Sequence, residues 1–227
     1  MQSLRAHPRI QIIGSAYSIL NAEEISCSLL KDAADRRTGY VCVANVHTTM
    51  MGTFDSSYQR ITNAAAYAVP DGMPLVWAMK TLGATNQSRV RGPSLMREIL
   101  DRGRTNNLKH YLYGGSPAAV SALRKTLEEA YPGCLIVGAE SPPFRPLEAI
   151  TPAEWEADAA RINASGAHFV WVGLGAPKQE RWMWEQKDRV EGLMLGVGAA
   201  FDLISGRIPE APQALQRLGL EWLYRLS

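Results

Sequence analysis

The chain has 227 residues, 46% of them hydrophobic and 20% charged, so it is long enough to bury a sizeable core and too apolar for intrinsic disorder. Its 24 basic and 22 acidic residues leave a net charge of +2, which provides no overall field to recruit nucleic acid or a membrane. Three dispersed cysteines without a Cys-x-x-Cys pair favour a reduced, cytoplasmic setting, and without a signal peptide or ~20 consecutive apolar residues we expect a protein that is soluble or at most peripheral.

Apolar runs typical of buried strands alternate with helix-length segments along the chain. The predicted strands span residues 10–13, 40–46, 67–69, 110–113, 134–139, 167–174 and 193–200. The predicted helices span roughly 22–37, 48–63, 73–82, 93–104, 117–131, 152–164 and 177–190. Ser116-Pro117 and Thr151-Pro152 are typical helix starts, with a capping hydroxyl followed by proline. The alternation predicts an α/β domain over residues 1–210, a Rossmann-like variant with a mainly parallel sheet flanked by helices.

The last segment, residues 211–227, has the spacing of a C-terminal amphipathic helix. Its apolar side would consist of Leu215, Leu218, Trp222 and Leu226. This helix either packs against the core or begins a segment with a separate role.

Four predicted strands end in loops of unusual composition. These loops contain Asn45 and Thr48, then Pro70-Asp71-Gly72, then Gly114 and Gly115, and finally Gly175, Lys178 and Gln179. Because the carboxyl ends of parallel strands share one edge of a sheet, a carboxylate, amides and glycine turns are expected to converge there.

Asp71 has two interpretations. Pro-Asp-Gly is ordinary turn chemistry, in which Asp caps and Gly supplies a positive φ. A lone carboxylate between a buried strand and a helix, among three other loops of ligand-binding composition, instead indicates a functional group. Convergence at one sheet edge favours the second interpretation.

The loop GLGAPKQE, residues 173–180, resembles an anion site because glycines let the backbone approach a ligand and a helix follows. Lys178 would add a point charge and Gln179 a directional hydrogen bond. The alternative is a tight turn with a solvated lysine. The loop is not a dinucleotide fingerprint, since the third glycine of G-x-G-x-x-G falls at Lys178, and the chain has no G-x-x-x-x-G-K-[ST] motif.

Other catalytic patterns are weaker. His47 follows a strand and could act as a general base, although a lone histidine is more often packed or solvated. No G-x-S-x-G elbow or H-E-x-x-H helix occurs, which disfavours hydrolases and metalloproteases. Asp-x-Asp is also absent, so a sugar transferase of this sequence would work without a dedicated metal site, and we expect no cofactor.

An ordered set of motifs resembles the WecG/TagA/CpsF family of bacterial glycosyltransferases. The set comprises VANV, PDG, RVRG, YLYGGSP, YPGCLIVG, INASG, VGLGAPKQE, GVGAAFDLISG and LGLEWLYRL, spread from about residue 10 to residue 226. The resemblance implies transfer of a sugar, typically of the N-acetylmannosamine type, from a UDP donor to a polyprenyl-diphosphate-linked sugar at the cytoplasmic membrane face. The products would be teichoic acids, enterobacterial common antigen or exopolysaccharides.

The resemblance also implies roles for individual residues. The family's catalytic base falls on Asp71, and its substrate-contacting Asn, Arg and Gln fall on Asn45, Arg89 and Gln179. Asp71 would deprotonate the acceptor hydroxyl in a single inverting displacement. Where many members have Thr-x-Asn, this chain has Val43-Ala44-Asn45, so Thr48 is the candidate to supply the missing hydroxyl.

Members of the family usually continue into a basic tail that associates with the membrane. Here the chain stops at Ser227, so residues 211–227 would be the start of such a tail, cut short. The expected location is peripheral at the inner face of the cell membrane. Besides donor, acceptor and membrane, a second copy of the chain is a candidate partner, whereas nucleic acid is not expected.

Alternative functions remain open at this level. The donor could carry a hexose or a uronic acid in exopolysaccharide assembly. A noncatalytic module that binds UDP-sugars would keep the glycine loops without needing Asp71. An NAD-dependent oxidoreductase would need a glycine fingerprint after the first strand, which residues 13–16 do not provide.

Overall fold

The computed structural model describes residues 7–212, 215 and 221. Its centre is a six-stranded sheet with the order β4-β3-β8-β7-β5-β6, and every neighbouring pair is parallel. The strands are β3 (Gly39–Ala44), β4 (Tyr67–Pro70), β5 (Lys109–Gly114), β6 (Leu135–Glu140), β7 (Phe169–Gly173) and β8 (Leu193–Gly196). The predicted α/β class and parallel sheet are therefore confirmed, and the carboxyl ends of these strands lie along one edge.

The first predicted strand does not belong to this sheet. Residues Arg9–Ile12 form β1, which pairs antiparallel with a strand that the sequence analysis missed, β2 (Ser15–Ser18). The reason is the turn between them, where Ile13 and Gly14 both have positive φ, at 49° and 78°. Two consecutive left-handed residues form the tight turn of a hairpin, so the chain folds back at once and does not continue into a helix.

Nine helices flank the sheet in the described part of the chain. They are α1 (Ala22–Ala34), α2 (Val46–Phe54), α3 (Ser56–Ala64), α4 (Met73–Thr81), α5 (Gly92–Gly103), α6 (Pro117–Ala130), α7 (Pro152–Ala164), α8 (Lys178–Gln186) and α9 (Ala200–Ile204). Short 3-10 turns occur at η1 (Arg104–Asn106) and η2 (Leu147–Ala149). Ser116 and Thr151 cap α6 and α7 as predicted, each accepting from a backbone N–H in the first turn.

The predicted helix over residues 48–63 is two helices. Asp55 ends α2 and begins α3, and its side chain accepts from the backbone N–H groups of Ser57 and Tyr58. An aspartate that caps a new helix interrupts the preceding one, because its own backbone is extended. Helix α9 was not predicted from the sequence, because it has only five residues and is buried almost throughout.

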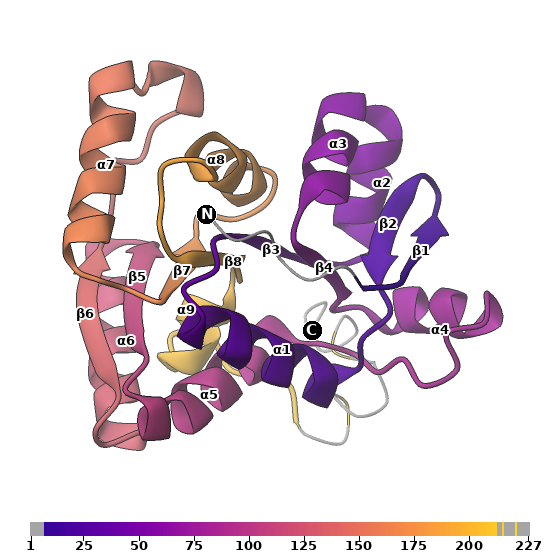
Figure 1. The fold of residues 1–227 in the computed structure, drawn as a ribbon, viewed down its shortest axis with the longest axis horizontal. Helices are drawn as coiled ribbons and strands as arrows, with labels where there is room; N and C mark the ends of the chain where they lie inside the picture. Colours follow the sequence, from indigo (N-terminus) through magenta and orange to yellow (C-terminus); the bar gives the residue numbers. More distant parts are fainter. Residues whose placement is uncertain (1–6, 213–214, 216–220, 222–227) are drawn as a thin grey trace.

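Two apolar layers cover the sheet. On one face α1, α5, α6 and α9 pack through residues such as Ile25, Ile99, Leu123 and Phe201. On the other face α3, α4, α7, α8 and the β1–β2 hairpin pack through residues that include Ile61, Met79, Ile162, Trp182 and Tyr17. Figure 1 shows α3, α7 and α8 on one side of the sheet, with α1 and α5 on the other. Apart from the edge strand β6, which is mostly half-buried, the strands are buried on both faces, which explains their continuous apolar composition.

Most of the predicted C-terminal helix lies outside the described residues. Leu215 is helical and partly buried, and Glu221 is helical and buried. Leu218, Trp222 and Leu226 are not described, so the predicted apolar side of this segment stays a prediction.

Candidate functional site

The strand order brings five loops into a row at the carboxyl edge of the sheet. Reading across β4, β3, β8, β7 and β5, these loops contain Asp71, Asn45, Gly198, Gly175 and Gly115. The first two loops are joined directly, since the backbone N–H of Asp71 donates to the carbonyl of Ala44 over 2.7 Å. The expectation that the four loops share one edge is thus confirmed, and β8 adds a fifth between them.

Asp71 lies just beyond β4, with its side chain 28% exposed. Its Oδ1 is 3.2 Å from Nη2 of Arg89, and Arg89 Nε also donates to the backbone carbonyl of Asp71. Burial raises the pKa of Asp71, while Arg89 and Arg91 oppose this effect and Glu221 adds to it. The carboxylate is therefore fixed in place by a cation and still holds a proton more readily than an ordinary aspartate.

A chain of alternating charges extends from Asp71. Glu221 Oε2 is 2.9 Å from Arg89 Nη2, and Glu221 Oε1 is 2.9 Å from Arg91 Nε. Arg91 Nη2 lies 3.3 Å from Glu210 Oε2, and Glu210 also pairs with Arg97. Arg91, Glu210 and Glu221 are not among the site residues predicted from the sequence.

Two of these residues lie within motifs that the sequence analysis quoted, but their spacing along the chain does not assign them to the site. Arg91 is the second arginine of the quoted motif RVRG, and Glu221 is the acid of LGLEWLYRL. Nothing in the sequence indicates that these two motifs meet, since 130 residues separate them. A pocket of about 270 Å³ lies beside the two arginines and is also lined by Met73 and Ser94.

Asn45 and Thr48 form a reciprocal capping box at the start of α2. The Asn45 side chain accepts from the backbone N–H of Thr48, and the Thr48 hydroxyl interacts with the backbone N–H of Asn45 over 2.9 Å. Thr48 is buried, whereas Asn45 and its neighbour His47 are exposed. Asn45 lies against the Asp71 turn, because a Cβ placed on Gly72 would be 3.8 Å from the Asn45 Cβ. Asn45 therefore borders the site, while the Thr48 hydroxyl serves helix α2.

The predicted glycines serve two different purposes. Gly114 allows β5 to approach β7, because a Cβ there would lie 2.6 Å from the Gly173 carbonyl carbon. Gly115 continues this contact by donating its N–H to the carbonyl of Gly173 over 2.9 Å. Gly175 has a φ of +76° and open space where a Cβ would point. Gly175 can thus approach a ligand, whereas Gly114 and Gly115 first satisfy packing between strands.

Gln179 lies over the carboxyl end of β8 and is 5% exposed. A Cβ on Gly196 would be 3.1 Å from Gln179 Nε2, and a Cβ on Gly198 would be 3.4 Å from Gln179 Oε1. Gln179 Nε2 donates to Glu180 Oε1 over 2.8 Å, but Gln179 Oε1 has no hydrogen-bond partner. A buried acceptor without a partner at a sheet edge is a feature expected of a ligand contact.

Lys178 points away from Gln179. Its Nζ donates to the carbonyl of Arg145 over 2.6 Å and lies 5.4 Å from the centre of the Phe144 ring. It lines a pocket of about 190 Å³ together with Tyr113, Glu140 and other residues near the end of β6. The structure thus separates Lys178 from Asp71 and from Arg89.

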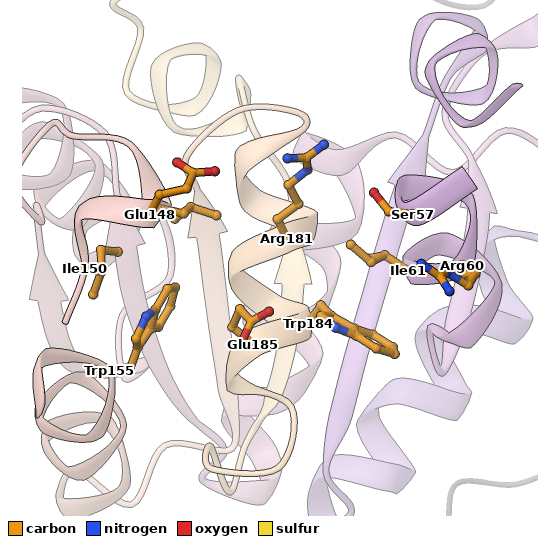
Figure 2. Close-up of a pocket in the computed structure, with 10 residues that line it drawn as sticks. Ser57, Arg60, Ile61, Glu148, Ile150, Trp155, Arg181, Trp184 and Glu185 are labelled. Carbon is orange, nitrogen blue, oxygen red and sulfur yellow. The ribbon is translucent and has the colours of Figure 1, made fainter. Parts of the chain in front are cut away.

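A groove of about 790 Å³ lies on the outer surface of α8. Figure 2 shows Trp155 on one side of it, Ser57, Arg60 and Ile61 on the other, and Arg181, Trp184 and Glu185 between them. Arg181 Nη2 is 2.7 Å from Asp55 Oδ2 at the junction of α2 and α3. None of the residues predicted from the sequence lines this groove.

Among the described residues, no group of three or more histidine, cysteine, aspartate or glutamate side chains is arranged to hold a metal ion. Within residues 7–212, no helix has both the length and the apolar composition needed to cross a bilayer.

Residues 10–227 match the family described as Glycosyl transferase WecG/TagA/CpsF family, which covers essentially the whole chain. This range includes the loops at the carboxyl edge and the two arginines beside Asp71. The chain therefore belongs to the WecG/TagA/CpsF family of glycosyltransferases, which act in the synthesis of cell-surface polysaccharides.

Proposed function

We propose that this glycosyltransferase moves a sugar of the N-acetylmannosamine type from a UDP donor to a polyprenyl-diphosphate-linked sugar, with inversion and without a metal ion. Residues 1–210 would be the catalytic domain. The product would enter cell-surface polysaccharide or teichoic acid synthesis. The observation that carries the proposal is Asp71, a partly exposed carboxylate held by Arg89 at the loop edge with a raised pKa.

Asp71 acts as the general base. It accepts the proton of an acceptor hydroxyl while the hydroxyl oxygen forms a bond to the anomeric carbon of the donor sugar. The bond from that carbon to the UDP oxygen breaks, and its electron pair leaves with UDP. One displacement inverts the anomeric centre. A base positioned by a backbone hydrogen bond and a guanidinium loses little entropy on reaction.

Burial of Asp71 suits this role. An aspartate with an ordinary pKa is a weak base at neutral pH, and a raised pKa increases its proton affinity while leaving it ionised above that value. Arg89 limits the rise, so the carboxylate stays available.

Arg89 and Arg91 recognise phosphate. A guanidinium presents a planar set of N–H donors that matches phosphate oxygens, and both arginines line the pocket of about 270 Å³ described above. Glu221 occupies these donors in the structure. A diphosphate of donor or acceptor would compete with Glu221 for Arg89.

The donor lies along the middle of the edge. The open backbone at Gly175 and the first turn of α8 offer N–H groups to a diphosphate. Gln179 and Asn45 border the same space from β8 and β3. For Lys178 to reach the diphosphate, its ammonium would exchange the Arg145 carbonyl for a phosphate oxygen.

Because the acceptor is linked to a lipid, the enzyme has to act at a membrane surface. The outer faces of α2 and α4 support this part of the proposal. Val46, Met50 and Phe54, which are 42%, 37% and 84% exposed, form a stripe on α2. Trp77 and Leu82 are 57% and 56% exposed on or just after α4. Neither helix contains an acidic residue, and both begin directly after site loops. We place the protein at the inner face of the cell membrane, where a basic tail beyond residue 211 would add contacts.

Turnover assays test the proposal directly. The protein is incubated with UDP-N-acetylmannosamine, its uronic acid or UDP-glucose and a synthetic undecaprenyl-diphosphate-linked N-acetylglucosamine analogue, and UDP release is followed with and without EDTA. Release only with the first donor supports the proposed sugar, and release with another donor identifies a hexosyl or uronosyl transferase. UDP binding without any release would indicate a noncatalytic module, and loss of turnover in EDTA would refute metal independence.

A further inference from the structure

Gln179 and Glu180 form an internal pair that the proposed mechanism uses only in part. Glu180 is 1% exposed, and burial raises its pKa even though hydrogen bonds from Gln179 and Tyr58 and from the backbone oppose the rise. It points into the layer between α8 and β3, near the buried Cys42. Burying an ionised carboxylate in such a place costs free energy. A specific role for this carboxyl group would explain why it is buried there.

The geometry of the pair restricts the amide. Gln179 Nε2 donates to Glu180 Oε1 over 2.8 Å, inside the protein. A carboxyl group offers an accepting oxygen in both its ionised and its neutral form. The Gln179 amide is therefore oriented with its NH₂ toward Glu180 and its carbonyl oxygen on the side of Gly198, where a Cβ would be 3.4 Å away.

The opposite orientation is disfavoured while Glu180 is ionised. A flipped amide would turn its carbonyl oxygen toward a carboxylate oxygen, and neither of these two atoms can donate a hydrogen. Glu180 thus selects one of the two amide orientations.

We propose that Glu180 is a positioning residue, which holds Gln179 so that its unpaired carbonyl oxygen accepts one hydrogen bond from an N–H or O–H group of the sugar nucleotide. The inference rests on the proposed function, because it needs a ligand at the carboxyl edge. The bare carbonyl oxygen does not suit a phosphate, whose oxygens are themselves acceptors. Gln179 therefore contacts the uracil imide or a hydroxyl or amide N–H of the sugar, while the diphosphate faces the backbone N–H groups near Gly175.

A double-mutant cycle tests this arrangement. Gln179→Met and Glu180→Met, singly and together, are titrated by calorimetry with UDP and with a UDP-N-acetylhexosamine, below their melting temperatures. We expect Gln179→Met to weaken binding about 3- to 10-fold, as for the loss of one neutral hydrogen bond. Glu180→Met should weaken binding by no more than that, and the double variant should bind as Gln179→Met does.

Two variants serve as controls. Glu180→Gln keeps an accepting carbonyl and should retain most of the affinity even if the methionine variant folds poorly. Gln186→Met changes another glutamine of α8 that is fully buried, donates to the Trp155 carbonyl and has an unpaired Oε1. It should lower the melting temperature and leave binding unchanged, since Gln186 lies at the other end of the helix.

Comparing the titration with UDP and the titration with the UDP-sugar identifies the group that Gln179 recognises. Equal losses for UDP and the UDP-sugar assign the contact to uracil, and a loss with the UDP-sugar alone assigns it to the sugar. Additive losses, or normal affinity in Glu180→Met beside weakened Gln179→Met, would overturn the positioning role. Unchanged affinity in Gln179→Met would overturn the contact itself. A wild-type protein that binds no sugar nucleotide would refute both this inference and the proposed function, whereas the other outcomes leave the function standing.

Discussion

Replacing Asp71 with asparagine removes the proposed base while keeping the size of the side chain and most of its turn chemistry. General bases contribute roughly 10²–10⁴-fold to rate, so we expect kcat to fall by that factor, or about 3–5 kcal/mol in activation free energy. The KM for the donor should change little, because Asp71 contacts the acceptor hydroxyl. The assay is UDP release at saturating donor and acceptor.

The same substitution should leave the fold intact. The folded pKa of Asp71 is raised, so the ionised carboxylate disfavours folding at pH values above that pKa, and the effect disappears as the pH falls below the unfolded value. Asparagine avoids this cost but loses the pair with Arg89, in which the two side chains are 28% and 16% exposed. A partly exposed pair contributes about 1 kcal/mol or less, which corresponds to a shift of about 2–4 °C in Tm.

A second aspartate gives a matched control. Asp55 caps α3, and hydrogen bonds from Ser57 and Tyr58 lower its pKa to about 2. Asp55→Ala should therefore lower Tm and spare kcat, the opposite of Asp71→Asn. Near-normal turnover in Asp71→Asn, or a large loss of Tm without a separate loss of kcat in the folded protein, would refute the base assignment and return Asp71 to the role of a turn residue.

Glu221, His110 and Lys178 each give a further prediction. Glu221→Gln should shift the acid limb of the kcat/KM profile to lower pH, because Glu221 helps to raise the pKa of Asp71; a shift to higher pH would contradict this coupling. Burial lowers the pKa of His110 from 6.5 to about 3, so stability should be complete above pH 6.5 and fall as the pH drops toward 3, by about 2 kcal/mol at pH 5 in urea unfolding. His110→Asn, which can still accept from the Trp171 indole N–H, should remove this contribution and leave that of His168, whose pKa burial lowers to about 4, and an unchanged slope would exclude His110 as a source. Lys178→Ala should weaken UDP binding by about 1–3 kcal/mol if its ammonium moves to the diphosphate, whereas unchanged affinity in calorimetry would leave Lys178 with Arg145.

Local chemistry explains why much of the fold was predictable. Continuous apolar runs indicated strands buried on both faces, and Ser116 and Thr151 marked two helix starts that the structure contains. The local signal was ambiguous at Asp55, where one predicted helix is two, and at Ile13-Gly14, where a strand turns back into a hairpin. Whether Asp55 interrupts a helix, and whether Ile13 adopts a positive φ, depends on what the flanking segments pack against.

The candidate site divides in the same way. Parallel strands end at a common edge whatever their order, so the sequence by itself determined that Asp71, Asn45 and the glycine loops face one side, and its motifs determined the family. Only the tertiary structure decided which loops are neighbours, that Lys178 turns toward Arg145, and that Glu221 reaches Arg89. Side-chain direction and contacts between distant segments depend on the packing of whole elements, and neither residue type nor local spacing encodes that packing.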